Sequence, residues 1–119
     1  MTGTMTQMNV RKLAEQTYVI DVNGEINARS ENALMDAYAQ VNRDQVRNIV
    51  LNFSNLEYMN SSGIGLLVTL LIRVQRQNQR LLACGLNSHY RQIFELTRLD
   101  EAISIHEDED EVIAALDIG

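Results

Sequence analysis

The chain has 119 residues, the length of one domain, and its hydrophobic content of 45% can form a single core without disulfides or metals. It contains no proline, six glycines and no Ser/Gly-rich run, so no interdomain linker is recognisable. The formal net charge of -6 argues against binding nucleic acid by phosphate neutralisation, and also against an acidic partner or an anionic membrane surface. The composition therefore predicts one compact acidic domain.

The cysteine content and the beginning of the chain indicate the compartment. The only cysteine, Cys84, lies in the apolar run LLACGL, which predicts a buried reduced thiol and no disulfide framework. The first ten residues, MTGTMTQMNV, lack the basic and apolar regions of a signal peptide, and no apolar stretch reaches the ~18 residues of a membrane span. We therefore expect a cytoplasmic protein with no direct membrane insertion and a flexible N-terminus at residues 1–7.

The first half of the chain predicts two strands, a helix and a central strand. Residues 17–22 (TYVIDV) alternate as a strand does, residues 8–13 are its expected antiparallel neighbour, and Gly24 is expected to end the pair. Ser30 is expected to cap an amphipathic helix. The apolar stripe of that helix consists of Ala33, Leu34, Ala37, Tyr38 and Val41. The short apolar run 48–53 (NIVLNF) is typical of a strand buried on both faces.

The second half predicts three more helices and two more strands. A long helix is expected to follow the serines at 61–62 and to end near Gln79, with arginines in its last turns at 73, 76 and 80. Residues 81–86 predict a strand, Ser88 is expected to cap the next helix, and residues 102–105 predict a short strand. Residues 108–116 predict a last helix with a solvated acidic first turn. This alternation predicts an α/β domain whose small mixed sheet is mainly parallel and is packed by about four helices.

The stretch YMNSSGIGLL (58–67) places two serines and two glycines where the long helix begins, although a helical glycine costs about 1 kcal/mol relative to alanine. Asn60 or Ser61 can cap the helix. Capping leaves Gly63 and Gly65 unexplained, and their missing side chains allow another backbone or surface to approach closely. The turn is expected just outside the carboxyl end of the central strand, where open α/β sheets place functional groups.

Three chemistries compete at this turn. A dinucleotide site is disfavoured because Val68 occupies the third small-residue position, and a P-loop because its lysine is missing. A serine hydrolase needs a base, but His89 and His106 lie in no catalytic motif and are each expected to be surface or capping residues, too sparse for a metal site. We therefore expect no catalytic residue, no metal and no cofactor. Phosphorylation of a serine would instead add nearly two negative charges at a helix N-terminus and repel a docked partner without unfolding the domain.

The segments GEIN (24–27), NIVLNFSNLEYMNSSGIGLL (48–67) and 81–116 together resemble the STAS domain family, specifically the single-domain bacterial anti-sigma factor antagonists. The resemblance implies a single STAS domain over residues 8–117. In that family the first serine after an aspartate at the end of the third strand is phosphorylated, and by position that serine is Ser61.

The resemblance also implies a partner-switching mechanism. An anti-sigma factor with a histidine-kinase-like ATPase fold acts as a serine kinase: it binds the unmodified domain, phosphorylates it with ATP and magnesium, and then separates. A PP2C-type phosphatase restores binding. The STAS protein would be a phosphorylation substrate and a binding protein in transcription regulation.

Two residues depart from the family pattern, which usually has aspartate at the positions of Asn27 and Asn60. Asparagine keeps the size and capping ability of aspartate but not its charge, which could alter kinase recognition or phosphate turnover. We expect Ser61 to be the phospho-acceptor, and the docking turn is expected to comprise Asn60, Ser62, Gly63 and Gly65, with Glu25 and Asn27 at its rim. Two alternatives stay open: an unphosphorylated adaptor or structural subunit of a transporter or multi-protein complex, and a sensor that binds an anion or nucleotide at the helix end.

Overall fold

The structure is a computed structural model that describes residues 6–116. Its strands are β1 (Gln7–Ala14), β2 (Thr17–Ile26), β3 (Asn48–Asn52), β4 (Leu56–Met59), β5 (Arg80–Cys84) and β6 (Ser104–His106). Its α-helices are α1 (Glu31–Val41), α2 (Ser61–Arg76), α3 (Ser88–Leu96) and α4 (Glu109–Leu116), and two short 3-10 helices are η1 (Ala28–Ser30) and η2 (Leu99–Glu101). Within the described residues, no helix is long and apolar enough to cross a bilayer.

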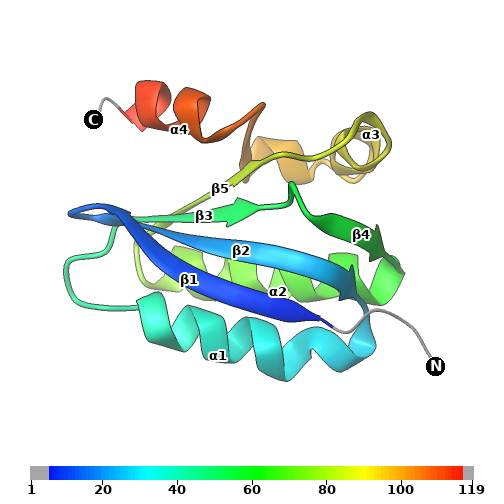
Figure 1. Ribbon diagram of the computed structural model, residues 1–119, viewed down its shortest axis with the longest axis horizontal. Helices are drawn as coiled ribbons and strands as arrows, with labels where there is room; N and C mark the ends of the chain where they lie inside the picture. The colour runs from blue at the N-terminus through cyan, green and yellow to red at the C-terminus, as the bar shows by residue number, and fades with distance from the viewer. Residues whose placement is uncertain (1–5, 117–119) are drawn as a thin grey trace.

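The strands form one sheet in the order β1-β2-β3-β5-β6, and β4 pairs with the far end of β2. Strand β1 is antiparallel to β2, and the other pairings are parallel. Figure 1 shows α1 and α2 on one face of the sheet and α3 and α4 on the other. The predicted mixed, mainly parallel sheet with about four helices is confirmed.

The central position of β3 follows from its sequence. Ile49 and Leu51 belong to the larger core cluster, while Val50, on the opposite face, packs in a smaller cluster with Cys84 and with Val112 of α4. A continuous apolar run thus fills both faces of the sheet, as predicted. Cys84 is buried, as expected, and burial raises the pKa of its thiol to about 11.

The sequence missed β4, and it placed the end of β2 too early. The pairing of β1 with β2 ends at Asn23, so Gly24 does close that pair; its φ is 84°. Strand β2 nevertheless continues to Ile26 because its last residues pair with β4 instead. This extension carries the GEIN segment alongside the residues that precede the serine turn.

Three helix ends also differ from expectation. Helix α2 ends at Arg76 rather than near Gln79, since Asn78 adopts a left-handed conformation with φ 57°, and Arg80 already belongs to β5. The side chain of Asn87, not of Ser88, caps α3. Ser30 precedes α1 as expected, but its hydroxyl makes no capping bond to that helix and instead accepts a hydrogen bond from the Asn27 N–H at 2.9 Å.

The chain ends bear on the predicted domain limits. Of the expected flexible segment 1–7, residues 1–5 lie outside the described residues, as does residue 117 of the expected domain 8–117. Gln7 begins β1 and pairs with Asn23, so the first strand starts one residue before the predicted domain limit. The flexibility of the N-terminus and the limits 8–117 stay predictions.

Candidate functional site

The serine turn lies where β4 passes into α2. Asn60 is the N-cap: its backbone is extended, and its Oδ1 accepts a hydrogen bond from the Gly63 N–H at 3.0 Å. Ser61 and Ser62 are the first two helical residues, and both are exposed. The capping role expected of Asn60 is confirmed, and both hydroxyls face solvent on a fixed helix end.

The two glycines of the turn have different roles. Gly63 is buried, and a Cβ atom there would lie 2.5 Å from the Ile26 carbonyl oxygen and 2.8 Å from Cγ of Met59. The backbone that approaches Gly63 therefore belongs to this chain and not to a partner. Gly65 is exposed, with nothing within 4 Å of its Cβ position, so it leaves open surface one helical turn beyond Ser61.

The predicted rim residues do lie beside the turn. Strand β2 pairs with β4 through Glu25 opposite Tyr58, and the Asn60 N–H donates to the Ile26 carbonyl at 3.2 Å. Asn27 follows directly and caps η1, with its Oδ1 accepting from the Arg29 N–H at 2.9 Å. The GEIN segment and the serine turn thus lie next to each other at the end of the sheet, where β2 pairs with β4, as Figure 1 shows.

One supporting residue was not predicted. The Tyr90 hydroxyl of α3 accepts a hydrogen bond from the Met59 N–H at 2.9 Å, and Tyr90 is buried. This bond fixes the last residue of β4 before the cap. The sequence offered only an indirect signal: Tyr90 is the third residue after the capping Asn87, which orients the first turn of α3.

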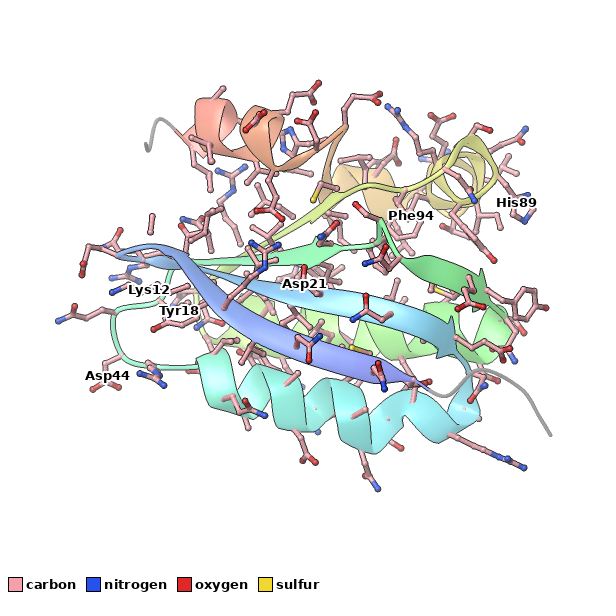
Figure 2. All side chains as sticks on the ribbon, viewed as in Figure 1. Lys12, Tyr18, Asp21, Asp44, His89 and Phe94 are labelled. Atoms are coloured by element: carbon pink, nitrogen blue, oxygen red, sulfur yellow. The ribbon has the colours of Figure 1, made fainter. Side chains whose placement is uncertain are left out.

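Neither histidine belongs to this site as a base. His89 is exposed on α3, as expected, and Figure 2 shows it at the outer edge of that helix. His106 is not a surface residue: its side chain is only 16% exposed, and Nδ1 lies 3.7 Å from a carboxylate oxygen of Glu111. In the described part of the chain, neither imidazole hydrogen-bonds to Ser61 or Ser62.

A second polar cluster lies on the opposite face of the sheet from α1 and α2. The Arg11 guanidinium donates to both carboxylate oxygens of Asp21, at 2.7 and 2.9 Å, and to Glu109 of α4. The hydrogen bonds that Arg11 donates to Asp21 lower the pKa of this carboxyl below its ordinary value. The hydrogen bond from Arg11 to Glu109 holds the start of α4 against the sheet. Glu109 is half-buried, so the acidic first turn is only partly solvated, in contrast to the prediction.

The STAS domain family matches residues 7–112, and the chain belongs to this family. Its relatives include the anti-sigma-B factor antagonist of Staphylococcus aureus, which is 27% identical over 93 residues and covers 78% of this chain and 86% of its own. The corresponding protein of Staphylococcus epidermidis is 23% identical over 90 residues, covering 76% of this chain and 83% of its own. The resemblance inferred from the spaced motifs is thereby confirmed.

Solved structures show the same fold. An anti-sigma factor antagonist from Mycobacterium paratuberculosis superposes with a TM-score of 0.78 at 22% identity, covering 93% of both chains. The unphosphorylated form of the anti-sigma factor antagonist SpoIIAA gives 0.72 at 20% identity, covering 92% of this chain and 97% of its own. Phosphorylated Bacillus SpoIIAA gives 0.65 at 20% identity, covering 92% and 99%.

Proposed function

We propose that the protein is an anti-sigma factor antagonist that acts by partner switching, with Ser61 as the phospho-acceptor. The observation that carries the proposal is the exposed Ser61 hydroxyl on a helix end held by the Asn60 cap and by the contact of Gly63 with Ile26. Relatives named anti-sigma-B factor antagonist support the pathway. A fold similar to both the unphosphorylated and the phosphorylated SpoIIAA structure supports a switch that leaves the domain folded.

The turn suits a switch because its unmodified surface is small and uncharged. Ser61, Ser62 and Gly65 leave room for a partner to pack closely against the first turns of α2. A phosphate on Ser61 would be tolerated locally, since the helix N-terminus carries free N–H groups and the positive end of the dipole. The partner, in contrast, would meet a bulky dianion, and the complex would separate.

The two asparagines are compatible with this role. Asn27 and Asn60 make the capping bonds that an aspartate at either position would make, so the missing carboxylates change charge and not the shape of the turn. A phosphate on Ser61 would also meet less like-charge repulsion than it would beside two aspartates. The departures from the family pattern therefore bear on the rate of phosphorylation and turnover.

The phosphoryl transfer requires a kinase partner. The Ser61 oxygen would form a bond to the γ-phosphorus of ATP, the bond to the β-phosphate oxygen would break, and ADP would leave. The described part of this chain places no base against Ser61, so the proton would pass to a group of the kinase. We accordingly assign ATP, magnesium and catalysis to a histidine-kinase-like serine kinase that is itself the anti-sigma factor, and dephosphorylation to a PP2C-type phosphatase, all in the cytoplasm.

Calorimetry against the cognate kinase tests the proposal. Ser61→Ala should bind as the wild type does, whereas Ser61→Glu should bind roughly tenfold or more weakly, because a charge would be forced against the docked surface. Ser88→Glu is the matched control, since Ser88 is also an exposed first residue of a helix, and it should bind normally. Equal affinities for the three variants, or equal losses at positions 61 and 88, would contradict a switch at Ser61.

An unphosphorylated adaptor is the second candidate, because a kinase that recognises the usual aspartates would find no carboxylate at Asn27 or Asn60. Such a subunit would form a stoichiometric complex that persists when ATP and magnesium are added. A switch would lose its partner under the same conditions. Size-exclusion chromatography of the complex before and after ATP distinguishes the two functions.

A further inference from the structure

Four arginines gather at the end of the molecule away from the serine turn. Arg43 and Arg47 lie in the loop after α1, and Arg73 and Arg76 lie in the last turn of α2; together they are called the arginine groove below. Arg43 and Arg47 line a depression of about 210 Å³, and Arg73 and Arg76 line one of about 340 Å³. Asn42 and Gln77 line both depressions, so the two are contiguous.

The groove continues toward the β1–β2 turn. A third depression of about 320 Å³ shares Arg43, Asp44 and Val46 with the first and is also lined by Lys12 and Tyr18. Figure 2 shows Lys12, Tyr18 and Asp44 together at this end of the molecule. The hollow surface is therefore elongated, and the cationic groups are spread along it.

The charges of the groove are not neutralised internally. Within residues 6–116, the cations that form ion pairs are Arg11, Lys12, Arg91, Arg98 and His106, the last only when protonated, and no carboxylate lies within 4.0 Å of the four groove arginines. Among the described residues, two acids line these depressions: Asp44 lines the same two as Arg43, and Glu15 lines the third and pairs with Lys12. The arginine groove is therefore locally positive although the chain as a whole has a net charge of -6, so the overall charge did not predict it.

The negative ends of helix dipoles explain only part of the arginine groove. Arg73 and Arg76 lie in the last turn of α2, where cations offset the negative end of the dipole. Arg43 and Arg47 follow α1, which ends at Val41, and lie outside any helix. Their exposure next to the α2 arginines is therefore not required by the fold.

We propose that the arginine groove binds an acidic polypeptide segment of a partner protein. The planar guanidinium forks match carboxylates in bidentate geometry, and their spread over contiguous depressions suits several carboxylates along one extended chain better than a single phosphate. Asn42 and Gln77, both exposed between the arginines, can bond the backbone of such a segment.

The aromatic residues of this end argue against a nucleotide or single-stranded RNA. Tyr38 is only 5% exposed and its hydroxyl donates to Gln79 at 2.8 Å, while the Tyr18 ring is covered by the Arg43 guanidinium at 5.7 Å. The Tyr38 ring therefore offers no face on which a base could stack, and one face of the Tyr18 ring is already occupied. The net charge of -6 disfavours an acidic partner for the chain as a whole, and the proposal departs from that expectation only at the arginine groove.

The groove and the serine turn lie at opposite ends of α2, which has 16 residues and so spans about 24 Å. A partner in the groove therefore leaves Ser61 accessible, and the protein can hold an acidic segment while its other end engages or releases a kinase. This inference does not depend on phosphorylation, and Ser61→Glu is expected to bind the acidic segment as the wild type does.

Titration of the full chain with a synthetic oligoglutamate peptide, followed by NMR amide shifts, tests the proposal. Shifts should concentrate at the amides of residues 42–47 and at Gln77, and affinity should fall as salt is raised. The double variants Arg43→Gln/Arg47→Gln and Arg73→Gln/Arg76→Gln should each bind roughly tenfold more weakly. Arg29→Gln is the matched control, because Arg29 is an exposed arginine just before α1, at the far end of that helix, and its loss should have no effect.

Two further probes make the outcome decisive. Oligoglutamine of equal length should not bind, and tripolyphosphate should bind more weakly than oligoglutamate. The proposal is overturned if oligoglutamate shifts no amide of the groove, if Arg29→Gln weakens binding as much as the double variants do, or if tripolyphosphate binds there and oligoglutamate does not.

Discussion

Replacing Gly63 by alanine should destabilise the domain, although alanine is the better helix former. The new Cβ would lie 2.5 Å from the Ile26 carbonyl oxygen, 2.8 Å from Cγ of Met59 and 2.9 Å from Cγ2 of Ile26. The carbonyl cannot move away freely, because it also accepts the Asn60 N–H at 3.2 Å. Such overpacking typically costs about 1–3 kcal/mol, against a gain of about 1 kcal/mol in helix propensity.

Urea denaturation followed by circular dichroism measures this difference. We expect the free energy of unfolding of Gly63→Ala to fall by up to about 2 kcal/mol after the two terms are combined. Gly65→Ala is the matched control, since nothing lies within 4 Å of its Cβ position; it should be neutral or more stable by up to about 1 kcal/mol. A Gly63→Ala protein as stable as Gly65→Ala would refute the contact between α2 and β2 on which the position of Ser61 depends.

Three further outcomes are expected. Asn60→Ala should lose about 1 kcal/mol in urea denaturation because the Gly63 N–H loses its cap, whereas Asn60→Asp should lose nothing; equal stability of all three proteins would contradict the cap. Arg11→Gln should be about 1 kcal/mol less stable at neutral pH, a small effect because this side chain is 42% exposed. Arg11 lowers the pKa of Asp21, so the stability that this ion pair contributes is present above about pH 4, the ordinary pKa of an aspartate. That stability is lost as the pH falls through the lowered pKa of Asp21. The unfolding curves of variant and wild type should therefore converge in acid. Cys84 should react with a thiol reagent at pH 8 roughly two orders of magnitude more slowly in the native protein than in urea; equal rates would exclude burial and the raised pKa.

The parts of the fold that could be predicted are those in which one periodicity dominates. The run 48–53 is short and wholly apolar at its centre, which is typical of a strand buried on both faces, and the stripe ending at Val41 predicted the inner face of α1. Strand β4 gives no such signal, because only Met59 of its four residues is buried and Tyr58 is 53% exposed. Its existence depends on pairing with the extended end of β2, a contact distant in sequence.

In the site, too, local features could be predicted and long-range contacts could not. The start of α2 and an accessible serine could be predicted from Asn60 and the exposed, uncharged residues after it. The purpose of Gly63 could not, because the atom that excludes a side chain belongs to Ile26, 37 positions earlier in the chain. The anchor at Tyr90 and the arginine groove were also hidden, since each depends on which segments the sheet brings side by side.

The most direct test of Ser61 as a phospho-acceptor is phosphosite mapping by mass spectrometry on the protein isolated from its own cells, with and without phosphatase inhibition. We expect a single phosphate on Ser61 that becomes more abundant when the phosphatase is inhibited, with none on the neighbouring Ser62. Absence of phosphate on Ser61 across growth and stress conditions would contradict the switch and favour the unmodified adaptor.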